Sequence, residues 1–395
     1  MKRPEVLVTG AGNPFRLTIT CESKLANISQ ITALAIDQSP PIAGRLRLAS
    51  FLSTGEFITW SLNRSPSASH SHLQSYHPSG RNSRASPIIH AVYHHPLVVT
   101  LSKAFSLSIY DLSSNTVRLT QTVTSFTSYP PSSLVLSNPF PSTYKLVLAY
   151  AIPVYPAHWS VGVTELLIGG SSSSSSTQPS NSATSRLDFT PETLAHGLDD
   201  LVIRSTRTIR SIDVPHGWVD ERKLRAMREQ WGRKVSQILD TRTDGKWVVL
   251  APGDRVSFLA GRSTPQEPSL TSSSSPQDAI GPNASHTPSA FGLQLYRLTL
   301  PPPSPSVSAS PPKLTFVRTL YGQSGPITAL ALADGRCVSL GLNGSIWVWD
   351  LENGTGAEVA AGGFPAREMD SVVAFDDQRI ISALAGNVVV RTFDI

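Results

Sequence analysis

FVRTLYGQSGPITALALADGRCVSLGLNGSIWVWDL, residues 316–351, is the stretch that decides the fold. It divides into the alternating segments ITALAL, CVSLGL and SIWVWDL, which are joined by Asp334-Gly335 and Asn343-Gly344. Asp-Gly and Asn-Gly pairs supply the positive φ angles that tight hairpins require. With FVRTLYG as a further strand in front, the stretch predicts one four-stranded antiparallel sheet.

Three other stretches repeat this plan. Residues 28–62 end in Trp60-Ser61, residues 88–112 in Tyr110-Asp111-Leu112, and residues 369–395 in Phe393-Asp394. Weaker units follow at 134–168, 186–214, and 235–259 with 292–300, and EVLVTG and FRLTIT form a pair of strands at the N-terminus. Self-similarity at a period of about 40 residues is the mark of a propeller. These units give about six to eight blades, and we predict seven.

The segment 316–351 resembles a WD repeat. Gly322-Gln323 stands where that family has Gly-His, Asp334 and Asn343-Gly344 match its turns, and Trp349-Asp350 closes the unit. In the family, the His and the turn Asp belong to a structural hydrogen-bond network, so Gln323 and Asn343 imply a weaker network. The resemblance assigns a structural blade motif to Gly322, Gln323, Asp334, Asn343, Gly344, Trp349, Asp350, Trp60, Tyr110, Asp111, Phe393 and Asp394.

The expected fold is therefore an all-β, WD-repeat-like β-propeller that occupies residues 1–395 as a single domain. An N-terminal strand would complete the blade built by 369–395, because closure removes a free sheet edge. We expect loops at 64–87, 169–185 and 261–290, which are rich in Ser, Pro and other small or polar residues. The stretch 301–312 favours polyproline conformations, as a stiff connector or as a docking strip for a Pro-reading domain.

One helix is expected inside the β pattern, at 220–233. Asp220 is its N-cap candidate, and Leu224, Met227 and Trp231 recur at helical spacing. We expect this apolar stripe to pack on the propeller. The opposite face carries the candidate partner-binding residues Arg222, Arg225, Arg228 and Arg233, which would contact an acidic partner.

Composition narrows the function classes. Charged residues are 15% of the chain and it contains 31 Pro, which favours short strands and turns over long helices. The net charge is +5, but the bases are scattered outside 204–234, so nucleic-acid binding is not expected. Two cysteines and the lack of a signal sequence point to a cytoplasmic or nuclear protein. The most apolar stretch, 146–168, is too interrupted by Pro to span a membrane.

Several patterns imitate chemical sites without completing them. Gly10 and Gly12 follow a strand, but the third glycine of a dinucleotide fingerprint is replaced by Phe15. The segment 322–326 has its second glycine one residue too early for a nucleophile elbow. The histidines at 70–77 and 90–95 lack helical spacing and a joining carboxylate or thiol. We expect no catalytic residues, no metal and no cofactor.

The predicted function is a non-enzymatic scaffold or substrate-receptor propeller that binds other proteins. The degenerate repeats and the inserted helix are similar to the propeller region of fungal F-box/WD-repeat proteins, which implies ubiquitin-ligase components as partners. No F-box is seen before residue 28. We expect a monomer outside its complex, with no membrane partner. Two alternatives stay open, a propeller enzyme with a site at the channel mouth and an RNA-binding propeller.

Overall fold

A computed structural model describes most of the chain. The described residues are 3–9, 16–26, 28–41, 44–63, 69–78, 86–140, 142–155, 157–170, 201–212, 219–253, 292–301, 311–323, 325–363, 371–384 and 387–393. They fall into two compact units, and each is treated by itself below. The expected single domain over 1–395 stays a prediction.

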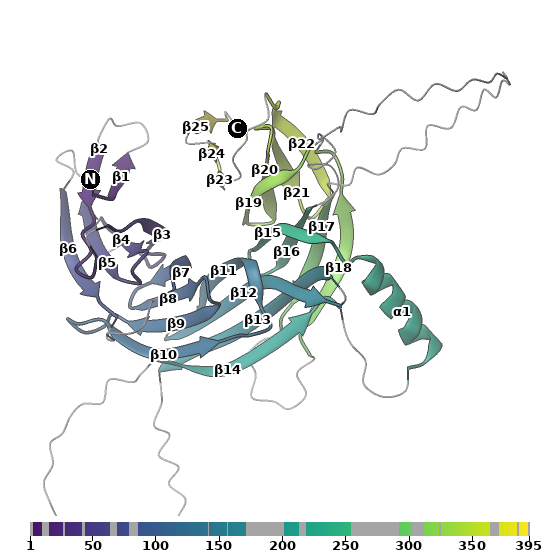
Figure 1. The fold of residues 1–395 in the computed structure, drawn as a ribbon, viewed down its shortest axis with the longest axis horizontal. Helices are drawn as coiled ribbons and strands as arrows, with labels where there is room; N and C mark the ends of the chain where they lie inside the picture. Colours follow the sequence, from purple (N-terminus) through teal and green to yellow (C-terminus); the bar gives the residue numbers. More distant parts are fainter. Residues whose placement is uncertain are drawn as a thin grey trace, which may run out of the picture. The chain divides into compact units, whose positions relative to one another are not determined.

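The first unit contains a hairpin and two four-stranded sheets (Figure 1). The hairpin consists of β1 (Glu5–Thr9) and β2 (Arg16–Thr20). One sheet has the order β3-β4-β5-β6, with β3 Ile31–Ile36, β4 Arg45–Leu52, β5 Phe57–Asn63 and β6 Ser69–Tyr76. The other has the order β7-β8-β9-β10, with β7 Ile88–His94, β8 Leu97–Ser102, β9 Ser106–Asp111 and β10 Arg118–Thr124.

One sheet has strands that contribute residues to both units. Its order is β11-β12-β13-β14, with β11 Tyr129–Phe140, β12 Thr143–Val154, β13 His158–Gly170 and β14 Leu201–Arg210. These are the longest strands of the described chain, because apolar residues continue through β12 and β13 without a turn signal.

The second unit contains three further sheets and the helix α1 (Glu221–Gly232). The first sheet consists of β15 Gln237–Thr243, β16 Trp247–Gly253, β17 Leu293–Thr299 and β18 Lys313–Leu320. The second consists of β19 Ile327–Ala333, β20 Arg336–Gly341, β21 Ile346–Asp350 and β22 Thr355–Ala360. The third has three strands, β23 Ser371–Phe375, β24 Arg379–Leu384 and β25 Asn387–Thr392.

The structure confirms the all-β propeller class and corrects the number of blades from seven to six. Five sheets have four strands and one has three, and the β1–β2 hairpin is a separate two-stranded sheet. The prediction was too high because it treated 134–168 and 186–214 as separate units. Their strands belong to one sheet, β11–β14. In this sheet β13 pairs with β14, although a long segment between Gly170 and Leu201 separates the two strands in the sequence.

A second correction concerns the stretch 64–87, which the sequence predicts as a loop. It contains β6, whose Ser- and His-rich strand pairs along β5 and completes the blade. Backbone pairing to a neighbouring strand stabilised this polar segment, which composition alone does not reveal. Of the other expected loops, 169–170 end β13, whereas 171–185, 261–290 and 302–310 lie outside the described residues.

The predicted hairpin turns have the expected backbone geometry. Asp334 and Gly335 have φ of 48° and 74°, and Gly344 has φ of 83°. These turns set the register, in which Cys337 lies opposite Trp349 and Ala333 opposite Arg336. A positive φ at adjacent turn residues matches the twist of the flanking strands.

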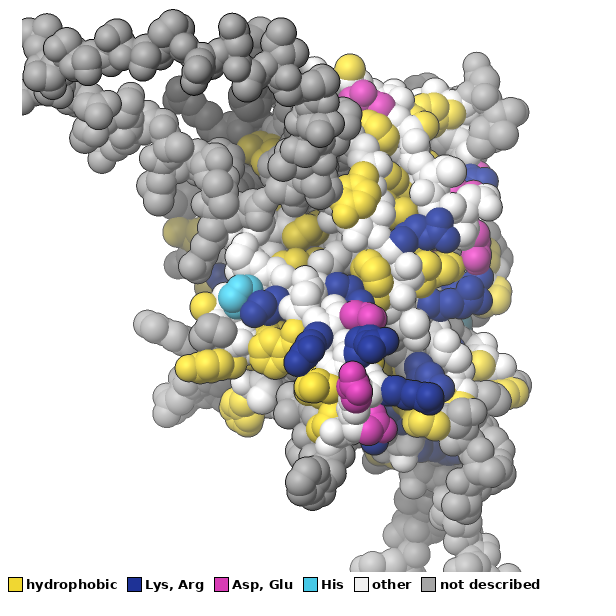
Figure 2. Space-filling model, turned by 90° about the vertical axis from the view of Figure 1, so that its right-hand side faces the viewer, with side chains coloured by type: hydrophobic (Ala, Val, Ile, Leu, Met, Phe, Trp, Pro, Cys, Tyr) yellow, Lys and Arg dark blue, Asp and Glu magenta, His cyan; other side chains and the backbone are white. Residues whose placement is uncertain are grey.

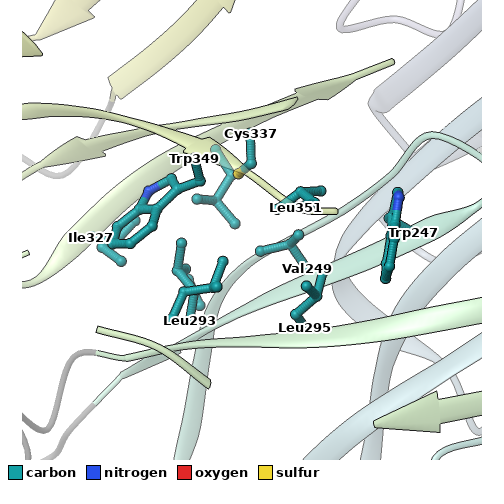
Figure 3. Close-up of a cluster of buried hydrophobic side chains, with 11 residues drawn as sticks. Trp247, Val249, Leu293, Leu295, Ile327, Cys337, Trp349 and Leu351 are labelled. Atoms are coloured by element: carbon teal, nitrogen blue, oxygen red, sulfur yellow. The ribbon is translucent and has the colours of Figure 1, made fainter. Parts of the chain in front are cut away.

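Apolar side chains fill the space between successive sheets of the same unit. Between β15–β18 and β19–β22, Trp247, Val249 and Leu295 face Ile327 and Trp349 (Figure 3). Burying each such large side chain contributes about 1.5–3 kcal/mol, so these faces hold adjacent blades together. Cys21 and Cys337 are both buried and free.

The N-terminal hairpin packs on the first blade. Val6, Leu17 and Ile19 form a buried cluster with Leu48 and Trp60 of the β3–β6 sheet. Within the described residues β1 hydrogen-bonds to β2 and β25 to β24. Closure of the last blade by an N-terminal strand therefore stays a prediction.

Candidate functional site

The blade motif of residues 322–350 forms a buried hydrogen-bond chain. Trp349 Nε1 donates to Ser339 Oγ at 2.9 Å, and Ser339 Oγ donates to Gln323 Oε1 at 2.6 Å. Gln323 Nε2 then donates to Ser345 Oγ at 3.4 Å. All four side chains are at most 1% exposed. The amide of Gln323 thus acts as both acceptor and donor in the position where the WD repeat has His.

The turn residues of the motif support this chain from the backbone. Asn343 Oδ1 accepts a hydrogen bond from Ser345 N at 3.0 Å, which places Ser345 beneath Gln323. Gly341 lies in a crowded position, since an added Cβ would stand 2.7 Å from Gln323 Nε2. The motif is therefore a tightly packed structural feature of one blade.

The first blade contains a second chain of this kind, which the sequence reading missed. Trp60 Nε1 donates to Ser50 Oγ at 3.2 Å, and Cys21 Sγ donates to the same oxygen at 3.3 Å. In both blades the Ser precedes the Trp by 10 residues. Burial raises the pKa of the Cys21 thiol, so it stays a neutral donor. The sequence signal that could have revealed this second chain is a hydroxyl residue ten positions before the Trp.

The residues that end two other blades, Tyr110-Asp111 and Phe393-Asp394, make different contacts. In the second blade Tyr110 hydrogen-bonds Thr100, again ten positions earlier, and burial raises the pKa of Tyr110 to about 12. Asp111 Oδ1 accepts from Ser113 N at 2.9 Å. Phe393 packs at the edge of a buried cluster of the last blade, and Asp394 lies outside the described residues.

The carboxylate of Asp350 caps the turn after β21. Its Oδ1 accepts from the backbone N–H groups of Glu352 and Asn353, and its Oδ2 accepts from Asn353 Nδ2. These hydrogen bonds from Asn353 and Glu352 hold the pKa of Asp350 below its ordinary value. Asp350 therefore stabilises a turn.

Two buried carboxylates tie adjacent blades together, and sequence patterns did not single them out. Asp240 Oδ2 accepts from Leu330 N of the next blade at 2.8 Å and from Arg242 Nε at 3.2 Å. Asp37 Oδ1 accepts from His95 N of the next blade at 2.9 Å. Burial raises the pKa of Asp240. Each carboxylate satisfies backbone groups at a blade junction, which explains its burial.

The described residues hold no group of three or more His, Cys, Asp or Glu side chains suited to a metal ion. His70 and His72 lie on β6, where both contact Trp60 edge to face. Gly10 and Gly12 lie outside the described residues. Within the described chain, no helix is long and apolar enough to cross a membrane.

Helix α1 lies beside the β15–β18 sheet (Figure 1). Asp220 is its N-cap and accepts a hydrogen bond from Lys223 N at 2.7 Å. The apolar stripe is only partly packed, since the helix has no fully buried residue and Leu224 is 40% exposed, whereas Met227 and Trp231 are half-buried. The residues that follow its last turn contact the blade.

Those residues anchor the C-terminal end of α1. The guanidinium of Arg233 lies 4.7 Å from the ring centroid of Phe316, and Arg233 O accepts from Gln294 Nε2 at 2.9 Å. Val235 and Trp159 exchange two backbone hydrogen bonds. Of the four arginines expected to bind a partner, Arg233 is therefore used to attach the helix to the blade.

The remaining candidates, Arg222, Arg225 and Arg228, are exposed on α1. Figure 2 shows that Lys and Arg side chains gather on the face that carries α1, with acidic and apolar side chains among them. In the part of the chain that the structure describes, these three arginines form no hydrogen bond or ion pair. The helix is thus anchored at its C-terminal end, presents exposed arginines and is only partly covered.

Six blades of antiparallel strands, with an indole–hydroxyl chain inside the blade and a turn Asp behind it, define a WD-repeat β-propeller. Proteins of this class generally work as platforms for protein interaction. Residues 16–211, just under half of the chain, match the family model described as the F-box protein pof12 beta-propeller. Over those residues the chain is similar to the propeller part of that family.

Solved structures resemble the chain at low identity. The β-propeller domain of Cps50 (Swd1) from Myceliophteria thermophila has 10% identity and a TM-score of 0.47, covering 99% of this chain and 91% of that one. Sqt1 from Saccharomyces cerevisiae has 10% identity and a TM-score of 0.44, covering 99% and 79%. The C-terminal WD40 domain of Sif2 has 10% identity and a TM-score of 0.41, covering 92% and 82%. No curated protein matches the sequence.

Proposed function

We propose that this propeller is a non-enzymatic scaffold or substrate receptor, in the cytoplasm or nucleus, and that α1 is its dedicated contact element. The proposal depends on one observation above all. Arg222, Arg225 and Arg228 are exposed on a helix whose apolar stripe is not fully covered, since Leu224 is exposed and Met227 and Trp231 are half-buried. A surface that combines bases with open apolar side chains fits an acidic partner protein.

The helix is also ordered in advance of binding. Asp220 caps its N-terminus, and Arg233 and Val235 attach its C-terminal end to neighbouring strands. A partner therefore meets a formed helix and does not lose affinity to its ordering. This supports α1 as a docking element over a loop that becomes ordered on binding.

The finer part of the proposal is a link to ubiquitin ligases. Its support is the description of the matched family as the propeller of an F-box protein, together with the propeller class itself. We propose that partners held by this chain include ubiquitin-ligase components or their substrates, and that the chain is a monomer outside such complexes.

The decisive experiment is affinity purification of the full chain and of the triple variant Arg222→Glu, Arg225→Glu, Arg228→Glu, followed by mass spectrometry. A matched control reverses three exposed lysines elsewhere, Lys24, Lys103 and Lys313. We expect acidic proteins bound by the native chain to be lost from the α1 variant and retained by the control. Their recovery should fall as salt is raised, because exposed charges are screened.

Equal recovery on the two triple variants would contradict the role of α1. Nuclease treatment adds a further arm, since material that disappears with nuclease indicates nucleic acid as the ligand. Ubiquitin-ligase subunits among the α1-dependent proteins would support the finer proposal, and their absence from that set would overturn it while leaving the scaffold role in place.

A further inference from the structure

A groove of about 530 Å³ lies between the β19–β22 blade and the β23–β25 blade, within the second unit. Its floor is apolar and consists of Val338, Val348, Phe375, Ile380 and Phe393. These residues belong to the buried cluster or pack against it. A volume of this size falls in the range of about 300–1,000 Å³ that is usual for ligand pockets.

The rim of the groove is acidic. Asp350, Asp376 and Asp377 line it together with one cation, Arg336. Arg336 lies directly opposite Asp350 in the β20–β21 ladder, so the charge of Asp376 and Asp377 is not balanced on the rim. A cationic group would therefore be favoured at that end.

The two unbalanced carboxylates are also well placed to receive a ligand. Asp376 Oδ1 accepts from the N–H groups of Gln378 and Arg379, which fixes its position in the turn. Asp377 is exposed and forms no hydrogen bond or ion pair with the described part of the chain. The carboxylate of Asp376 is thus held in place by the turn, whereas that of Asp377 is available to a ligand.

A third observation indicates the shape of the ligand. β22 is the outermost strand of its sheet, and in the described chain it pairs with β21 alone. Thr355, Gly356 and Ala357 of this strand line the groove and are exposed, and their small side chains leave the backbone edge accessible. An exposed edge beside an apolar groove is suited to an extended peptide that adds a strand.

We propose that this groove binds an extended segment of a partner protein that carries Lys or Arg close to a bulky apolar residue. The apolar side chain fills the floor beside Phe375 and Phe393, and the cation meets Asp376 and Asp377. The inference concerns a surface separate from α1 in sequence and does not depend on the role of the helix.

The test uses the full chain and a displayed library of random dodecapeptides, whose selected members are resynthesised with a fluorescein label. Two variants change the groove: Ala357→Trp fills it from β22, and Asp377→Lys reverses the free rim charge. Glu358 is exposed on the same strand but does not line the groove, so Glu358→Trp and Glu358→Lys are matched controls. Melting temperatures of all variants check that each is folded.

We expect the selected peptides to place Lys or Arg next to Leu, Ile or Phe. Ala357→Trp should weaken their binding by at least about tenfold, and Asp377→Lys by about two- to fivefold, since an exposed charge pair is worth less. Both Glu358 controls should bind as the native chain does. The triple α1 variant should also keep full peptide affinity, which separates this site from the proposed function.

Several results would overturn the proposal. They are enrichment of acidic peptides, failure to select any peptide, or equal affinity of Ala357→Trp and the native chain. A native dimer that Ala357→Trp dissociates in light scattering would show that a second copy of the chain occupies the groove instead.

Discussion

Trp349 and Trp60 occupy the same chemical position in two blades, yet their partners differ. The hydroxyl of Ser339, behind Trp349, donates to the amide of Gln323, whereas the hydroxyl of Ser50, behind Trp60, accepts from the thiol of Cys21. An amide is a stronger hydrogen-bonding group than a thiol. The indoles themselves are 1% and 8% exposed, so most of their contribution to stability comes from packing.

Replacing either indole should therefore destabilise the fold strongly. We expect Trp349→Ala and Trp60→Ala each to cost about 3–5 kcal/mol, because each leaves a large cavity in a packed cluster, Trp349 between two blades and Trp60 between the first blade and the N-terminal hairpin. The measurement is thermal melting followed by circular dichroism. Trp349→Phe is the control that keeps much of the volume while it leaves Ser339 without its donor, and it should cost less. Unchanged melting temperatures in both Ala variants would argue against the blade assignment.

Glu56 carries a buried charge in the hairpin between β4 and β5. Burial opposes ionisation, but hydrogen bonds from Ser23, Thr54 and His77 and from Lys24 N lower its pKa below the ordinary value. The ionised carboxylate is therefore bound more favourably in the folded than in the unfolded state. Its stabilising contribution is present above the unfolded pKa of about 4.3 and is lost as pH falls toward the folded pKa.

A pH series tests this contribution. Glu56→Gln should be less stable than the native chain at neutral pH, and the difference in melting temperature should shrink as pH falls below about 4.3. Carboxylates elsewhere lose their contributions in both proteins, so the difference isolates Glu56. A gap that stays constant down to low pH would show that the charge of Glu56 does not stabilise the fold.

At the scale of elements, α1 shows which parts of a helix its sequence specifies. Asp220 and the helical spacing of Leu224, Met227 and Trp231 predicted 220–233, and the helix spans Glu221–Gly232 with Asp220 as its cap. The same pattern suggested more packing than the helix has, with Leu224 exposed and Met227 and Trp231 only half-buried, because spacing identifies an apolar face but not how far it is covered. What attaches the helix is Arg233 on Phe316, a contact between residues far apart in sequence.

Because α1 is capped by a single side chain, Asp220→Ala should loosen the helix locally. Loss of an N-cap costs about 0.5–2 kcal/mol, and here the cost should appear as faster amide hydrogen exchange in 221–232. The blades should exchange and melt as before. Asp220→Asn keeps a capping oxygen and should retain protection. Faster exchange or a lower melting temperature of the blades would mean that the helix is coupled to them more tightly than its exposure indicates.

At the scale of the whole chain, local sequence signals were enough to predict the fold class correctly. They did not predict the number of blades. Asp334-Gly335 and Asn343-Gly344 marked one blade because tight turns demand particular residues. β13 and β14 pair across a segment of low-complexity sequence, and no local pattern announces such a long-range pairing. Asp240 and Asp37 were missed for the same reason, since their hydrogen-bond partners lie in the next blade.

The same distinction between local and long-range contacts predicts how the chain behaves without α1. No residue of the helix is buried, and its anchor, from Arg233 to Val235, follows the last turn. Replacing 220–232 by a Gly/Ser linker of equal length should therefore leave the melting temperature within about 2 °C of the native value, while the helical part of the circular dichroism spectrum disappears. A matched deletion that also removes 233–235 should lower the melting temperature, because it cuts the Trp159–Val235 hydrogen bonds and the contact with Phe316. If both deletions melt alike and well below the native chain, the blades depend on the helix and α1 is a structural support.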